Sequence, residues 1–139
     1  MGKFLLIDER DKFPNKNKTV MTKEFATAFA RDWVGAWNAH DLEKILSHYS
    51  EDFTIETPMA AKLYPQSHGT VVGKSEVRKY WTIGLEKSPN LRFEILDVLV
   101  GVNSLGLYLF NTSSNKKSVE LMSFNNEMKV NKAIVIYSE

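Results

Sequence analysis

Residues 91–100, LRFEILDVLV, open a run of four strand-like segments that fills the C-terminal third of the chain. The other three segments are residues 105–112, 118–124 and 133–137. Short clusters of Asn and Ser separate them, and these residues are typical of turns. Four consecutive strands joined by short turns predict an antiparallel meander.

The sequence before residue 91 has helical periodicity instead. Phe25, Phe29, Trp33 and Trp37 recur every four residues after Thr22, which places a broad aromatic stripe along one side of a helix. Thr22 has a side chain suited to an N-cap. We therefore predict a long helix lying across a curved sheet.

Three shorter elements and a loop are predicted between this helix and the meander. A second helix begins after Asp41, with apolar residues at helical spacing through Tyr49. Residues 53–57 alternate as a strand does, residues 59–72 have the composition of a long loop, and residues 75–86 predict a third helix. Because the helices come first and the strands last, we expect an α+β fold.

Composition indicates one neutral domain. The 139 residues contain no Cys, which excludes disulfides, zinc fingers and thiol nucleophiles. Eighteen Lys and Arg against 17 Asp and Glu provide no basic surface for nucleic acid or an anionic membrane. Residues 4–7 are too short for a signal peptide, so we expect a cytoplasmic protein. We predict an N-terminal arm over residues 1–21 and a domain over residues 22–139, and hypothesise that residues 1–20 extend upstream of a start at Met21.

Two motifs, WNAHDL at residues 37–42 and YSEDF at residues 49–53, resemble the opening of a known family. Further support comes, in this order, from IETP at residues 55–58, GKSEVRKYW at residues 73–81 and VELMSF at residues 119–124. Together they resemble the nuclear transport factor 2-like superfamily and its SnoaL-like and ketosteroid-isomerase-like groups. The resemblance implies a cone-shaped antiparallel sheet wrapped around the N-terminal helices, the cystatin-like α+β barrel.

The resemblance also implies a pocket between sheet and helices, and a homodimer formed through the outer face of the sheet. Such pockets are mostly apolar, so a small apolar or aromatic ligand is expected. The aromatic share of 12% would supply the walls. The predicted pocket residues are Trp33, Trp37, Phe53, Thr57, Trp81 and Tyr108. A purely structural role in the core is the alternative for each aromatic side chain.

The residues that ketosteroid isomerases use are altered in this chain. By resemblance, the general-base Asp of the first strand falls on Thr57, the helix Tyr on Trp33, and the later acid near Lys117. Thr cannot take a proton near neutral pH, and Trp offers only an indole N–H. We therefore do not expect the steroid isomerase reaction.

Two other side chains are candidates for acid–base catalysis. His68 lies in the predicted loop, and a histidine is a common carrier of protons near neutral pH, although a solvent-exposed histidine is the alternative. Glu120 alternates with Met122 and Phe124, so it is expected to point into the cone, where burial would raise its pKa. A structural hydrogen bond to a helix or the dimer face is the alternative for Glu120. Trp33 would donate a hydrogen bond to the ligand.

The sequence does not support a phosphate-binding loop or a metal site. Residues 69–75, GTVVGKS, lack the spacing of a phosphate-binding loop, and the three histidines lack the spacing of a metal site, so we predict no metal and no cofactor. The sequence therefore predicts a SnoaL-like small-molecule-binding protein with an unknown ligand. Isomerase, cyclase or lyase chemistry on a carbonyl compound is one interpretation. A non-catalytic homodimerisation or ligand-sensing module is the other.

Overall fold

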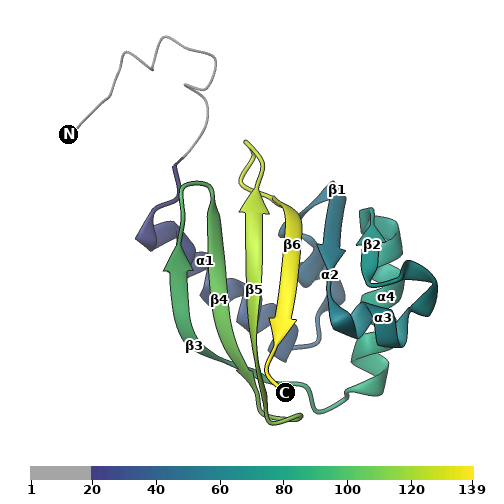
Figure 1. Cartoon of the computed structure of the whole chain (residues 1–139). Coiled ribbons are helices and arrows are strands. Elements are labelled where there is room, and N and C mark those ends of the chain that lie inside the picture. The colour runs from purple at the N-terminus through teal and green to yellow at the C-terminus, as the bar shows by residue number, and fades with distance from the viewer. Residues whose placement is uncertain (1–19) are drawn as a thin grey trace, which may run out of the picture.

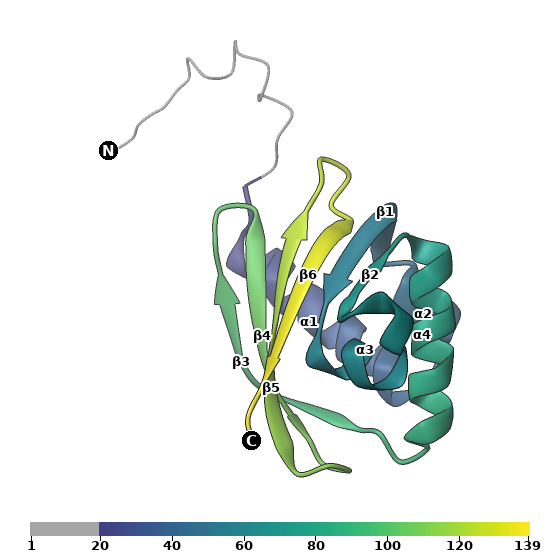
Figure 2. The same ribbon diagram turned by 45° about the vertical axis from the view of Figure 1, so that its right-hand side comes forward.

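The computed structural model describes residues 20–139, in which helices pack against the inner face of a curved sheet (Figures 1 and 2). Residues 1–19, which make up nearly all of the predicted arm, lie outside the described part. The helices are α1 (Lys23–Asn38), α2 (Leu42–Leu46), α3 (Pro58–Leu63), the 3-10 helix η2 (Pro65–Ser67) and α4 (Lys74–Lys87). The strands are β1 (Tyr49–Glu56), β2 (Thr70–Val72), β3 (Phe93–Val100), β4 (Ser104–Asn111), β5 (Lys116–Phe124) and β6 (Val130–Tyr137).

The six strands form one sheet in the order β2-β1-β6-β5-β4-β3. Strands β3 to β6 make the predicted antiparallel meander, and β1 joins it by pairing parallel with β6. Helix α1 lies behind this sheet in Figure 1, while α3 and α4 stand beside its β1–β2 edge. The α+β prediction is confirmed, as is the curved sheet around the N-terminal helices.

Helix α1 forms where the aromatic spacing predicts it. Thr22 is its N-cap, and the Thr22 hydroxyl accepts a hydrogen bond of 3.0 Å from the backbone N–H of Phe25. Phe29, Trp33 and Trp37 are all buried against the sheet side of the molecule. Each large apolar side chain buried in this way stabilises the fold by about 1.5–3 kcal/mol. The aromatic stripe therefore anchors α1 in the core.

The second predicted helix is shorter than expected. Helix α2 ends at Leu46, and Tyr49 begins strand β1 instead of completing the helix. Tyr49 lies opposite Val130 of β6 and packs against Phe53, with ring centroids 4.3 Å apart. Tertiary strand pairing thus overrides a local pattern that suits either structure.

The prediction of a continuous loop over residues 59–72 is wrong, because α3, η2 and β2 occupy most of it. Thr57 caps α3 by accepting a hydrogen bond of 3.2 Å from the N–H of Met59, and Pro58 occupies the first helical turn. Strand β2 has only three residues and exists through its pairing with β1. Helix α3 and strand β2 are both too short to show a periodicity in the sequence.

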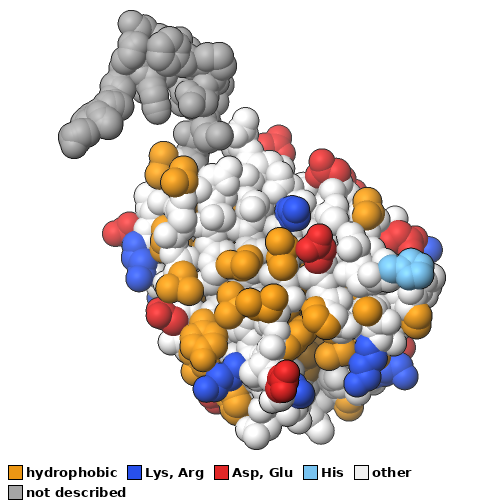
Figure 3. All heavy atoms as spheres, viewed as in Figure 1, with side chains coloured by type: hydrophobic (Ala, Val, Ile, Leu, Met, Phe, Trp, Pro, Cys, Tyr) orange, Lys and Arg blue, Asp and Glu red, His pale blue; other side chains and the backbone are white. Residues whose placement is uncertain are grey.

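Several exposed apolar side chains lie on the outer face of the sheet, interspersed with charged ones (Figure 3). Leu99, Leu121 and Ile136 are about half exposed there, on three different strands. The register places Leu99 and Leu121 on either side of Gly106. None of the helices described between residues 20 and 139 has the length and apolar composition needed to cross a bilayer.

Candidate functional site

A cavity of about 430 Å³ lies between the inner face of the sheet and helices α3 and α4. Its volume falls within the range typical of small-molecule sites. The apolar part of the wall includes Trp37, Ile55, Leu63, Trp81, Phe93 and Val135. The cavity therefore suits a ligand with a substantial apolar body.

Aromatic rings form one side of the cavity. The rings of Trp37 and Trp81 meet edge to face, with centroids 5.1 Å apart, and Trp37 meets Phe93 in the same way at 6.1 Å. The indole N–H of Trp37 is buried and has no hydrogen-bond acceptor among the described residues. This edge-to-face cluster holds the wall in a defined shape.

Glu120 contributes the only carboxylate among the cavity's lining residues, all of which lie in the described part of the chain. It sits on β5 between Leu107 of β4 and Val135 of β6, with its side chain on the inner face of the sheet. No hydrogen bond or ion pair between the described residues involves its carboxyl group. Burial raises the pKa of Glu120 from 4.5 to about 8. At neutral pH this acid is therefore mostly protonated and able to donate a proton.

The hydroxyl groups of Thr57, Tyr80 and Tyr137 are among those that line the cavity with Glu120. The Thr57 hydroxyl lies 3.3 Å from that of Tyr137, and Tyr80 lines the same cavity from α4. Burial, with Glu120 nearby, raises the pKa of Tyr137 to about 12. Burial also raises the pKa of Tyr80, with Tyr137 and Glu120 adding to the effect. Both tyrosines therefore keep their protons and remain hydrogen-bond donors across the neutral range.

Four of the predicted site residues meet in this cavity: Trp37, Thr57, Trp81 and Glu120. They come from α1, the end of β1, α4 and β5, and the fold alone brings them together. The alternation argument for Glu120 agrees with the burial of Met122 and Phe124 on the same strand.

Two predicted aromatic residues belong to the core instead. Trp33 and Phe53 are almost fully buried and do not line the cavity. The indole N–H of Trp33 donates a buried hydrogen bond of 2.7 Å to the hydroxyl of Tyr49. That donor is already used within the protein, which corrects the expectation that Trp33 donates to a ligand.

The remaining two predictions are also corrected. Tyr108 lies on the outer face of the sheet, because its neighbours Leu107 and Leu109 take the buried inner positions. His68 follows η2 in a left-handed conformation, with φ of 54°, and is exposed outside the cavity lining.

The sequence analysis missed Tyr80, Tyr137, Lys62 and Lys116, all of which line the cavity. Strand alternation could have indicated Tyr137, which shares its face with the buried Ala133 and Val135. Helical spacing could have indicated Tyr80, because Tyr80 and Trp81 lie on the same apolar face of α4. Within residues 20–139, no three His, Asp or Glu side chains gather as a metal site would require.

Residues 30–113 match the SnoaL-like domain family, and the chain belongs to this family. A SnoaL-like protein of unknown function from Burkholderia thailandensis is 35% identical, with a TM-score of 0.82 over 87% of this chain and 100% of that protein. No match was found among curated proteins.

More distant structures share the fold. One, proposed to be a ketosteroid isomerase from Kribbella flavida, is 16% identical, with a TM-score of 0.64 over 84% of this chain and 79% of that one. Another, of unknown function with a cystatin-like fold from Methylobium petroleophilum, is 12% identical, with a TM-score of 0.69 over 87% of this chain and 80% of that one. At these identities the comparison supports the architecture only.

Proposed function

We propose that this protein binds a small apolar or aromatic carbonyl compound in the cavity and that Glu120 moves a proton on it. One observation carries the proposal: a carboxyl group without a partner among the described residues lines a largely apolar cavity. Isomerase, cyclase and lyase steps on carbonyl compounds require a proton to be removed from, or delivered to, a carbon near the carbonyl. The position of Glu120 in the cavity lining supports its assignment to either transfer.

The neighbouring hydroxyl groups supply the complementary part of this chemistry. When the Glu120 carboxylate takes a proton from the carbon beside the carbonyl, the C–H electron pair moves into the enolate and negative charge develops on oxygen. Protonated Tyr80 and Tyr137 can donate hydrogen bonds to that oxygen. Return of the proton from Glu120 to a different carbon completes an isomerisation, whereas delivery of a deuteron that Glu120 has taken up from D₂O completes an exchange.

The test is hydrogen–deuterium exchange of 1-tetralone, an aromatic ketone, followed by NMR in D₂O. We expect the protein to accelerate exchange beside the carbonyl above the buffer rate, and the rate to rise with pH as Glu120 ionises, up to about pH 8. Glu120→Gln should abolish the acceleration while the thermal shift with 1-tetralone persists.

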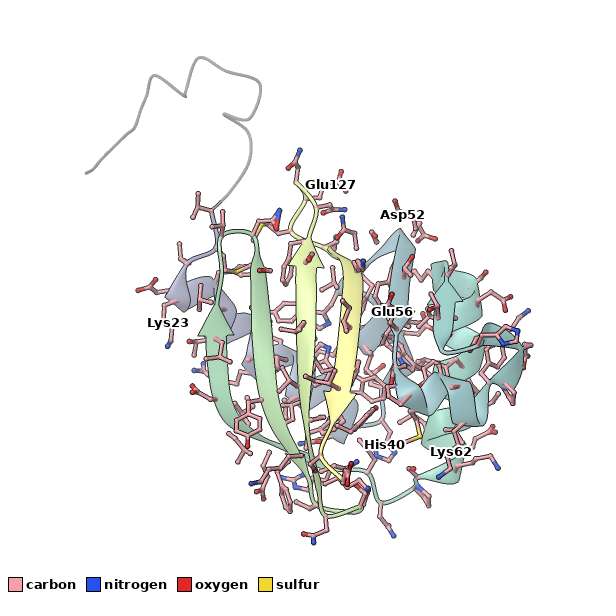
Figure 4. All side chains as sticks on the ribbon, viewed as in Figure 1. Lys23, His40, Asp52, Glu56, Lys62 and Glu127 are labelled. Carbon is pink, nitrogen blue, oxygen red and sulfur yellow. The ribbon has the colours of Figure 1, made fainter. Side chains whose placement is uncertain are left out.

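Glu127→Gln is the matched control, because Glu127 lies on the exposed β5–β6 turn, at the opposite end of the sheet from Lys62 (Figure 4). It should leave the exchange unchanged. Equal exchange by wild type and Glu120→Gln would remove Glu120 from the mechanism. If 1-tetralone raised the unfolding temperature of the protein but the protein did not accelerate its hydrogen–deuterium exchange, the second function would be favoured, a non-catalytic ligand-sensing or homodimerisation module.

We also propose that the protein forms a homodimer through the outer face of the sheet and acts in the cytoplasm. The exposed apolar side chains of Leu99, Leu121 and Ile136 support this dimer, because burying them removes apolar surface from water. Light scattering should give a dimer mass for wild type and a monomer mass for Leu121→Glu. Val102→Glu, which alters an exposed aliphatic residue on the turn between β3 and β4, should remain dimeric. A monomeric wild type would refute the dimer.

A further inference from the structure

The charged residues of the cavity are not spread evenly over its wall. Two lysines, Lys62 of α3 and Lys116 at the start of β5, line it together with Glu120. Both lysines are exposed, whereas Glu120 lies on the inner face of the sheet and is only partly accessible. The lysines therefore belong to the rim and Glu120 to the interior.

The rim is also rich in neutral polar groups. Ser88 follows α4, and Asn111, Ser113 and Ser114 belong to the β4–β5 hairpin, so hydroxyl and amide groups accompany the two lysines. The hairpin and the end of α4 lie at the lower end of the molecule in Figures 1 and 2. The cavity thus has an apolar body, and the exposed residues of its lining are mainly polar or cationic.

Neither lysine has a counter-charge within the site. No ion pair between the described residues includes Lys62 or Lys116. The only carboxyl in the lining, Glu120, is mostly neutral at pH 7 because burial raises its pKa to about 8. An anion entering the cavity therefore meets two positive charges and little repulsion.

We infer that the natural ligand is an amphipathic carboxylate whose apolar or aromatic body fills the cavity and whose carboxylate lies at the rim between Lys62 and Lys116. The inference rests on the proposed function, since it assigns a ligand class to the same cavity. A carboxylate at the rim leaves the rest of the ligand to extend along Trp37 and Trp81 toward Glu120. In this orientation the reacting carbon lies inside and the charged group outside.

The test compares two ligands of the same shape, 2-naphthylacetate and the neutral 2-naphthylacetamide, by isothermal titration calorimetry at neutral pH. For an exposed ion pair we expect each of Lys62→Gln and Lys116→Gln to weaken carboxylate binding about two- to fivefold, and the double variant about tenfold. The affinity for the amide should stay the same in all of them. Lys117→Gln is the control, because Lys117 is exposed next to Lys116 but does not line the cavity.

The outcomes separate the inference from the function on which it rests. Tighter binding of the carboxylate, lost in the two rim variants and retained in Lys117→Gln, supports the inference. Equal binding of carboxylate and amide overturns the anionic ligand class and leaves the cavity as a binding site. Carboxylate binding that survives both rim substitutions places the charge elsewhere and overturns the orientation. If neither ligand binds wild type, the cavity itself is not a ligand site, and both proposals fail.

Discussion

The raised pKa of Glu120 makes the stability of this protein depend on pH in a direction opposite to that of most acidic side chains. An acid whose pKa is higher in the folded state than in the unfolded state holds its proton more tightly when folded. Its contribution to stability is full below the unfolded pKa and is lost as the pH rises through the folded pKa. For Glu120 this window runs from 4.5 to about 8.

The size of the effect follows from proton linkage. With these two pKa values, a rise from about pH 5 to about pH 8.5 lowers the free energy of unfolding by at most about 4 kcal/mol. Water entering the cavity lowers the cost of ionising the carboxyl, so we expect about 2 kcal/mol. Replacing Glu120 with Gln, which is always neutral, should remove this loss. Wild type and Glu120→Gln should then be nearly equal in stability near pH 5 and differ by about 2 kcal/mol near pH 8.5.

The other titratable groups that line the cavity with Glu120 are Tyr80, Tyr137, Lys62 and Lys116. The two tyrosines stay protonated throughout this window because their pKa values are raised. Burial lowers the pKa of His48, outside the cavity, which makes stability rise with pH in the same range. His48 is present in both proteins, so its effect cancels in their difference.

Urea denaturation at a series of pH values provides the measurement, with fluorescence of the three tryptophans as the signal. Glu127→Gln removes an exposed carboxylate and should follow the wild-type curve. If Glu120→Gln lost stability with pH as steeply as wild type, Glu120 would be an ordinary solvated carboxylate. Both the geometry of the cavity and the acid–base role would then be in doubt.

Three further substitutions test the assignments made above. Trp33→Phe leaves the buried Tyr49 hydroxyl without its hydrogen-bond donor and should lower the free energy of unfolding by about 1–3 kcal/mol. Binding of 2-naphthylacetate should be retained. Lost binding with unchanged stability would mean that Trp33 contacts the ligand. Phe53→Ala opens the core and should cost about 3–5 kcal/mol by urea denaturation, and a cost below about 1 kcal/mol would contradict its burial. His68→Gly relieves the strain of a left-handed backbone conformation, so thermal unfolding should show a stability that is unchanged or raised by up to about 1 kcal/mol. The affinity for 2-naphthylacetate should stay the same. Weakened binding would mean that His68 belongs to the site.

Long elements with a clear period could be predicted from the sequence. The four-residue aromatic spacing of α1 and the alternation in β5 each depend only on the geometry of their own segment. Glu120 was found in this way, since alternation with Met122 and Phe124 requires no knowledge of the rest of the fold. The end of α2 could not be predicted, because Tyr49 fits a helical pattern and joins β1 only through its pairing with β6.

The sequence by itself determined the α+β class, the meander, the helix that carries the aromatic stripe and the inward direction of Glu120. Only the tertiary structure decided which aromatic residues face the cavity: Trp33 and Trp37 share one stripe, yet the first donates to Tyr49 and the second lines the site. It also decided that Lys62 and Lys116 share a rim, 54 positions apart in the chain. The physical reason is that periodicity gives the direction of a side chain relative to its own element, whereas the contents of a cavity depend on how separate elements pack.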